Sequence, residues 1–528
     1  MKKKVEDMEE NKMSKGKEIL AILLLTMVIG TGTLAWIVWS SKGNTKMNVT
    51  IGDLADVSFK TGNDINISNL SPSFYYDDGA LTEFSIRKKK GLTTELNTNI
   101  YLDITSISDE LKNDNFKYVL LSSSDGNTYN EVISSSFKDA GVGKLDIVTD
   151  NPLTDGKTYY KFYIWIDGNN ENNETMQGKS LKGTLNVDVS TPPVNAVTLV
   201  EGLDKGETGD SGSGVYKVTH SAIPASSSAT GSEIPAVTDY RYYGPSPNNY
   251  ICLDMEGGST CPDKHLYRII GSIYEEKENT NRIKVIKATP LTDGTTKGFS
   301  WDYKVNNGSV SYDNIWATIT SGNYSNSLTS GASLMQLLNS GAWWNGTSGS
   351  YYNNSTTATT VNFTNYKLSD KAKSYITTSR YYLGGYNKSS GVMTNQFYAY
   401  ERGTTRYDTN RPLYWDGMVG LMYSSDYGYA AGNSCVTGTD PFNYIVGCKN
   451  KDWLWMTTSS DYTNTAEWLM LPNSGNSRFV FNVYSSGYVF DSGHSSNTYA
   501  VRPVFYLTSS TSILEGTGEE NNPYIITK

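Results

Sequence analysis

Residues 158–166 read TYYKFYIWI, a stretch in which every second residue is large and apolar or aromatic. Successive side chains of a β-strand point to opposite faces, so this period of two predicts a strand with its even-numbered residues turned inward. Residues 99–107, NIYLDITSI, repeat the pattern. The two stretches predict that this part of the chain is built from half-buried strands.

Further strands and turns extend this pattern over residues 41–190. Residues 81–86, 116–121 and 181–189 are strand candidates, and Asp-Gly pairs at 78, 125, 155 and 167 mark turns between strands. Short strands separated by turns predict an antiparallel β-sandwich of the jelly-roll or immunoglobulin-like kind. Residues 71–189 resemble the jelly-roll modules of anchored or secreted Firmicute surface proteins of the TasA and camelysin kind. Residues 167–173 resemble half of a calcium loop, but missing ligands favour a polar turn.

An apolar stretch near the N-terminus, Ile19 to Trp39, contains no charged residue. As a helix it is long enough to cross about 30 Å of hydrocarbon, and lysines concentrate ahead of it. Because basic residues favour the cytoplasmic side, we expect a cytoplasmic tail at 1–18, a signal-anchor at 19–40 and an extracellular remainder of a single-pass protein. Cleavage near Ala35 is the alternative, although the apolar run continues beyond it.

The composition is that of a large, acidic and tyrosine-rich chain. Its 528 residues predict several domains, and 48 Gly with 39 Tyr is typical of β-rich extracellular proteins. The formal net charge of −9 argues against a nucleic-acid partner, since phosphate binding needs a basic face.

The four cysteines form two local pairs, Cys252 with Cys261 and Cys435 with Cys448. An even count in an extracellular domain predicts disulfides. Four cysteines allow three connectivities, of which local pairing is the simplest. The spacing and the scarcity of histidine argue against zinc, and we expect no cofactor.

The second half of the chain divides into a linker and a large domain. Residues 191–236 are rich in Gly, Ser and Thr, a composition that predicts a flexible linker. For the domain at 237–528 we expect paired strands at 266–273 and 282–288 and helices at 333–338 and 369–380.

Several motifs of this domain carry a resemblance. Residues 239–250 (DYRYYGPSPNNY), 266–271 (LYRIIG), 420–430 (GLMYSSDYGYA) and 499–507 (YAVRPVFYL) resemble the C-terminal domain of membrane-anchored surface proteins of gut Firmicutes. The last of these motifs, residues 499–507, is also similar to the end of the C-type-lectin-like fold, which formylglycine-generating enzymes share. This resemblance implies an α+β domain with a loop-rich upper half. The lectins' calcium motif and the enzymes' close copper-binding cysteine pair are missing, so neither site is implied.

Aromatic residues in loops of Gly, Ser and Asn are the candidate ligand contacts, because Tyr and Trp give large contact area at low entropy cost. The alternative is that these rings fill the core. The candidates are Trp343, Trp344, Asn345, Tyr351, Tyr352, Tyr423, Tyr427 and Tyr429.

The expected function is a non-enzymatic bacterial cell-surface binding or adhesion protein that recognises a glycan or a protein. The chain lacks Gly-x-Ser-x-Gly and His-Glu-x-x-His motifs, and its 3 histidines are scattered. The alternatives are a matrix or fibre subunit that assembles through the sandwich, and a surface hydrolase that uses paired carboxylates.

Overall fold

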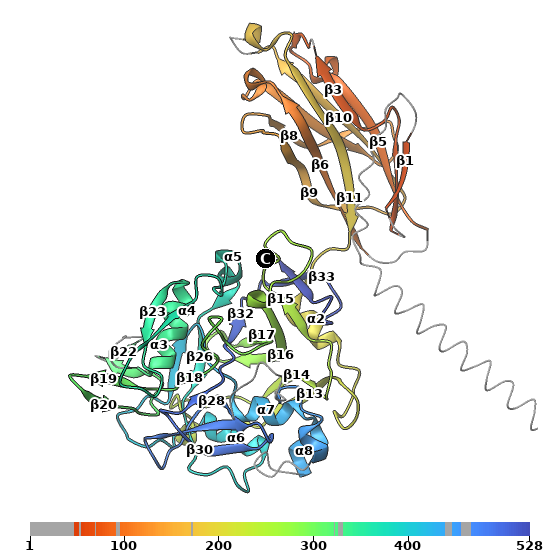
Figure 1. The fold of residues 1–528 in the computed structure, drawn as a ribbon. Helices are drawn as coiled ribbons and strands as arrows, with labels where there is room; N and C mark the ends of the chain where they lie inside the picture. Colours follow the sequence, from red (N-terminus) through yellow and green to blue (C-terminus); the bar gives the residue numbers. More distant parts are fainter. Residues whose placement is uncertain are drawn as a thin grey trace, which may run out of the picture. The chain divides into compact units, whose positions relative to one another are not determined.

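The computed structural model describes residues 47–51, 54–68, 70–90, 95–169, 173–320, 323–325, 331–438, 446–455 and 466–527. The chain forms two compact units, divided between Pro192 and Pro193 (Figure 1). Unit 1 is a β-sandwich, and unit 2 is a mainly β domain with short helices.

The strands of unit 1 form two facing sheets. They are β1 (Met47–Ile51), β2 (Ala55–Phe59), β3 (Asp64–Ser68), β4 (Pro72–Ser73), β5 (Ala80–Lys88), β6 (Leu96–Ile107), β7 (Phe116–Ser123), β8 (Asn130–Ser136), β9 (Gly143–Leu153), β10 (Lys157–Asp167) and β11 (Ser180–Ser190), with 3-10 helices η1 (Tyr76–Asp78), η2 (Asp109–Leu111) and η3 (Asn173–Met176). One sheet has the order β1-β2-β5-β10-β7-β8, with β4 beside β10, and the other has the order β3-β11-β6-β9. The predicted β-sandwich is confirmed.

The alternation in β10 explains the core of the sandwich. Tyr160, Phe162 and Ile164 are at most 1% exposed, and the Tyr160 ring stacks on Phe84 with centroids 5.0 Å apart. At the end of β10, the Asp167 carboxylate pairs with Lys117 and accepts the backbone N–H of Asn169, as a polar turn requires.

Unit 2 is organised on one large sheet with the order β12-β33-β34-β15-β16-β17-β32-β25. The β13–β14 hairpin joins this sheet because β14 also pairs with β16. The strands of unit 2 are β12 (Val194–Asn195), β13 (Gly214–His220), β14 (Val237–Tyr243), β15 (Tyr250–Cys252), β16 (Leu266–Glu275), β17 (Thr280–Lys287), β18 (Phe299–Ser300), β19 (Lys304–Asn306), β20 (Ser309–Ser311), β21 (Thr318–Thr320), β22 (Asn323–Ser325), β23 (Ser348–Tyr351), β24 (Thr359–Asn362), β25 (Ile376–Thr377), β26 (Ser379–Tyr382), β27 (Tyr414–Gly417), β28 (Ala466–Pro472), β29 (Phe479–Tyr484), β30 (Val489–His494), β31 (Thr498–Tyr499), β32 (Val504–Leu507), β33 (Ser512–Glu515) and β34 (Tyr524–Thr527). Its helices are α2 (Ala196–Gly202), η4 (Ala225–Ser227), η5 (Asp263–His265), α3 (Ser333–Asn339), α4 (Ala342–Asn345), α5 (Asp370–Ser374), α6 (Thr394–Glu401), α7 (Ser424–Ala430), α8 (Asn433–Gly438) and α9 (Val446–Lys449). The expected pairing of 266–273 with 282–288 is confirmed by β16 and β17.

The expected fold class, which combined a transmembrane helix and an α+β C-type-lectin-like domain with the sandwich, is wrong as a whole, because the described chain is mostly β. Residues 1–46, which include the predicted transmembrane helix, lie outside the described residues. In the part of the chain that the structure describes, no helix is both long and apolar enough to cross a membrane. The structure is 43% strand and 13% helix, and α6, an eight-residue helix, shows how short its helices are. The Gly-, Asn-, Ser- and Thr-rich sequence explains this, because these residues favour turns over helix interiors.

The predicted flexible linker at 191–236 is also wrong. This segment contains β12, α2 and β13, and β13 pairs along its whole length with β14. Asn195 caps α2 by accepting two backbone N–H groups, while Val200 and Val215 are buried in the core of unit 2. A few buried anchors therefore order a segment whose average composition is typical of a linker.

The two predicted helices have different outcomes. Residues 333–338 form α3, as predicted. The helix expected at 369–380 starts correctly, since Ser369 caps α5, but it ends at Ser374. Residues 376–378, Ile-Thr-Thr, are all β-branched, and the first two form β25. Such side chains pack better in a strand than in a helix.

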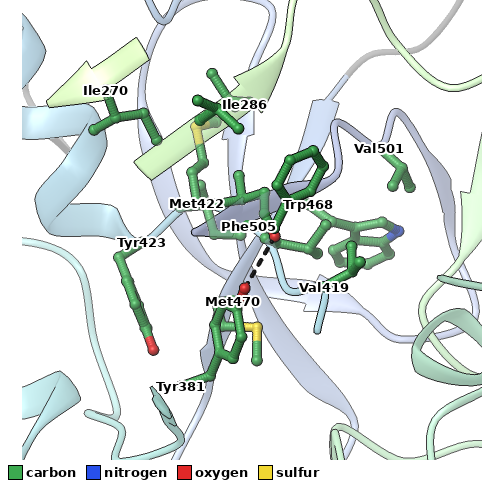
Figure 2. Packing of buried hydrophobic residues seen from close by; sticks show 14 of the residues in the cluster. Ile270, Ile286, Tyr381, Val419, Met422, Tyr423, Trp468, Met470, Val501 and Phe505 are labelled. Carbon is green, nitrogen blue, oxygen red and sulfur yellow. Dashed lines mark hydrogen bonds between the residues drawn. The ribbon is translucent and has the colours of Figure 1, made fainter. Parts of the chain in front are cut away.

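The core of unit 2 packs against its large sheet (Figure 2). Ile286 of β17 and Phe505 of β32 contact this core, and Trp468 of β28 is 0% exposed. The Trp468 indole N–H donates to the carbonyl of Phe299 at 2.8 Å, which satisfies its polar atom inside the core.

Candidate ligand-binding surface

Most of the predicted ligand contacts lie inside unit 2. The buried ones are Trp343 (2% exposed), Tyr351 (5%), Tyr423 (2%), Tyr427 (0%) and Tyr429 (3%). Three of the hydroxyls donate to carbonyls within unit 2: Tyr351 to Ser300 at 2.5 Å, Tyr423 to Tyr382 at 3.0 Å and Tyr427 to Gly487 at 2.8 Å. A ring without exposed area offers no contact to a ligand, so the prediction is wrong for these five residues.

Trp344, Asn345 and Tyr352 retain some exposure. The Lys373 ammonium lies 5.3 Å from the centroid of the Trp344 ring, and the Asn345 amide donates to the carbonyl of Ser340 at 2.7 Å. Both side chains thus already have partners within unit 2. Trp344 and Asn345 lie on α4 and Tyr352 follows β23, so all three are separate in sequence and element from Tyr423, which precedes α7.

Unit 2 contains a buried charged network that the sequence analysis missed. Asp239 of β14 accepts two hydrogen bonds from Arg241, which also donates to Asp426 of α7 at 3.0 Å. Lys284 of β17 donates to the other oxygen of Asp426. The charged network comprises Asp239, Arg241, Lys284, Glu401, Arg402 and Asp426, each at most 6% exposed.

Helices α6 and α7 bring Glu401 to this network. The Glu401 carboxylate accepts the backbone N–H of Ser425 at 2.9 Å and its hydroxyl at 2.6 Å, and it pairs with Arg402 at 3.3 Å. The helices approach closely at Gly428, where a Cβ would lie 2.2 Å from the Thr394 hydroxyl oxygen. Burial raises the pKa of Glu401 to about 7, against the opposing effects of Arg402 and Ser425.

The raised pKa of Glu401 makes unit 2 less stable as the pH rises from about 4.5 to about 7, because the unfolded carboxyl ionises first. Replacing Glu401 with Gln, which stays neutral, is expected to raise the free energy of unfolding by roughly 2 kcal/mol at pH 8 and to change it little at pH 4. Urea denaturation at the two pH values measures this. An equal change in the free energy of unfolding at the two pH values would contradict the raised pKa of Glu401.

Among the described residues, one group of side chains could hold a metal ion. Candidate ligand atoms of Asp254, Glu256 and His265 all lie within 4.8 Å of one another. Lys264 already pairs with Glu256 at 2.8 Å, and Ser369 donates to Asp254 at 2.6 Å. Lys264 neutralises Glu256 and Ser369 orients Asp254 without a metal ion. We therefore assign the group no role.

A small pocket lies elsewhere in unit 2. Its volume of about 20 Å³ has room for about one water molecule. Trp316 lines this pocket, and its buried indole N–H lacks a hydrogen-bond partner among the described residues. A water molecule in the pocket would supply an acceptor for this N–H group. Its polar wall includes Arg411, which binds both oxygens of Asp313 at 2.8 and 3.0 Å and is therefore neutralised. This pocket is too small for a sugar ring.

The two most exposed aromatic side chains among the described residues belong to unit 1. Phe74 and Tyr75 are each 69% exposed, and Tyr76 is 41% exposed. We call these three residues the aromatic loop. The sequence signal for it is the run Phe74-Tyr75-Tyr76 itself, because three consecutive rings cannot all face one side of a strand.

Internal contacts hold the aromatic loop in place. The Tyr76 ring packs edge-on against Tyr163 at 5.2 Å and Trp165 at 6.1 Å, both on the outer face of β10. The backbone N–H of Tyr75 donates to the Ser73 hydroxyl at 3.1 Å. Tyr76 thus anchors the loop to the sheet and leaves the two preceding rings in water.

The predicted disulfides, Cys252–Cys261 and Cys435–Cys448, are both present. They constrain loops of unit 2 and are typical of proteins outside the reducing cytosol. Comparison of the sequence with models of known protein families and with curated proteins finds no match.

Proposed function

We propose that this chain is a non-enzymatic extracellular binding protein whose aromatic loop contacts the ligand. The exposure of Phe74 and Tyr75 carries this proposal. Exposing two adjacent large rings costs hydrophobic stabilisation, and exposed aromatic clusters commonly mark interaction sites. The disulfides of unit 2 support an oxidising location.

The proposed ligand is a glycan or a protein surface. Flat rings stack on the apolar faces of sugars, and they also fill shallow pockets in protein partners. Asp77 and Asp78 follow the aromatic loop, and Asp78 accepts a hydrogen bond from Ser73 at 2.5 Å. Their acidity disfavours polyanionic ligands at this place.

Replacing Phe74 or Tyr75 with Ala in the full-length chain is expected to weaken binding by about 2 kcal/mol, which is roughly 30-fold. The free energy of unfolding is expected to change by less than about 0.5 kcal/mol, since neither ring is buried. A glycan and protein array identifies the ligand, and calorimetry then measures the affinity of each variant.

The matched control is Tyr366→Ala, which removes a ring that is 37% exposed in unit 2. We expect this variant to bind as the original chain does. Unchanged affinity of the Phe74→Ala and Tyr75→Ala variants would contradict the proposal. Self-association that these substitutions abolish, measured by sedimentation, would instead favour the fibre-subunit alternative.

A further inference from the structure

Lys284 and Asp426 form an ion pair that is almost completely sealed from water. The Lys284 Nζ lies 2.5 Å from Oδ2 of Asp426, and both side chains are 1% exposed. The ammonium also lies 4.6 Å from the centroid of the Tyr423 ring and 5.5 Å from that of Tyr506. Removing two charges from water in this way is costly, and their attraction recovers only part of the cost.

The pair contains the two groups of an amide, an amine and a carboxyl, already in contact. We propose that Lys284 and Asp426 condense into an intramolecular isopeptide bond that joins β17 to α7. Within the sealed pair, one proton first passes from the Lys284 ammonium to Oδ2 of Asp426, which gives a neutral amine and a neutral carboxyl group. The amine lone pair then forms the new C–N bond at Cγ, and the bond between Cγ and Oδ2 breaks. One ammonium hydrogen stays on the amide nitrogen and the other two leave with Oδ2 as water, so atoms and charge balance without any oxidant or reductant.

Neighbouring groups of the charged network assist this step. Arg241 donates to Oδ1 of Asp426 at 3.0 Å, which is the oxygen that remains, and it stabilises the negative charge of the tetrahedral intermediate. Burial lowers the pKa of Lys284 and so favours release of its proton. Lys284 and Arg241 lower the pKa of Asp426, so the proton reaches its Oδ2 through the direct hydrogen bond from Lys284.

Condensation leaves no charge of the network without a partner. Arg241 keeps its two hydrogen bonds to Asp239, at 2.7 and 3.1 Å, and Arg402 keeps Glu401 at 3.3 Å. The new amide carbonyl still accepts from Arg241. The product therefore replaces one buried ion pair by a neutral amide and leaves two complete ion pairs beside it.

Unit 1 provides an internal control. Its Lys117 Nζ also lies 2.5 Å from Oδ2 of Asp167, but the Lys117 side chain is 33% exposed. Water therefore reaches that ammonium, and the pair is not sealed as the pair of Lys284 and Asp426 is. We expect this pair to remain an ion pair, so that burial rather than proximity distinguishes the two sites.

The test is the mass of the purified full-length chain after reduction and denaturation. We expect it to be about 18 Da, one water, below the mass calculated from the sequence. Tryptic mapping should yield a branched peptide that contains both Lys284 and Asp426, with no cleavage after Lys284. Cleavage after Lys117 should proceed normally. An unmodified mass with full cleavage after Lys284 would overturn the proposal.

Two variants identify the reacting groups. Lys284→Arg keeps the positive charge but removes the amine, and it should have the mass calculated from its sequence. Asp426→Asn should lose about 17 Da, one ammonia, because the side-chain amide nitrogen is then the leaving group. A Lys284→Arg chain that still lost a water would place the bond elsewhere. If a variant does not fold, the branched peptide of the original chain still decides the question.

Discussion

Replacing Arg241 with Met is expected to lower the free energy of unfolding of unit 2 by about 3–5 kcal/mol. Arg241 is 2% exposed and binds both Asp239 and Asp426. Without the guanidinium, the hydrogen-bond partners that Asp239 keeps among the described residues are His220 and the backbone N–H of Tyr274, too few for a buried negative charge. Urea denaturation followed by tryptophan fluorescence measures the loss.

The control for this substitution is Arg478→Met, which removes an exposed guanidinium of the same unit. Its contact with the Tyr312 ring, at 5.4 Å, is open to solvent. We expect a change of less than about 0.5 kcal/mol. Similar losses for the two variants would contradict the proposed neutralisation of buried carboxylates by Arg241.

Replacing Trp468 with Ala is expected to cost about 3–5 kcal/mol of unit 2 stability, because it leaves a cavity at the centre of the core (Figure 2). The ring is 0% exposed and contacts the Trp301 ring at 5.9 Å and the Tyr499 ring at 4.4 Å. The substitution also leaves the carbonyl of Phe299 without its indole donor. The same denaturation experiment measures the effect.

Trp344→Ala is the matched comparison for Trp468→Ala. Trp344 is partly exposed and only borders the core, so its removal is expected to cost less than half as much. If both substitutions lowered the free energy of unfolding equally, the difference in burial between Trp468 and Trp344 would be contradicted. A loss of ligand binding in Trp344→Ala alone would return the candidate site to unit 2.

The sequence predicted the sandwich well because its core follows a local rule. In residues 158–166, each side chain's face depends only on its position along the strand, and the even-numbered residues are apolar. The second sheet, β3-β11-β6-β9, then covers that face. The same reasoning fails at 191–236, where a few apolar residues bind a core formed by distant strands.

The candidate site was predicted less well, because composition does not report exposure. Tyr427 and Tyr75 both lie in polar, tyrosine-rich surroundings, yet one is 0% and the other 69% exposed. The difference arises because α7 is covered by α6 and the large sheet, whereas the aromatic loop projects from an outer strand connection. Only the packing of neighbouring elements separates these two environments.

Taken by itself, the sequence determined the features that depend on residues close in the chain: the alternation of β10, the cap at Ser369 and the pairing of each cysteine with its nearest partner. The tertiary structure alone decided which charges meet. Lys284 and Asp426 are separated by 142 positions, and no local pattern marks either one for burial. They meet because β17 lies in the large sheet and α7 packs over it, and such long-range contacts follow from the complete fold.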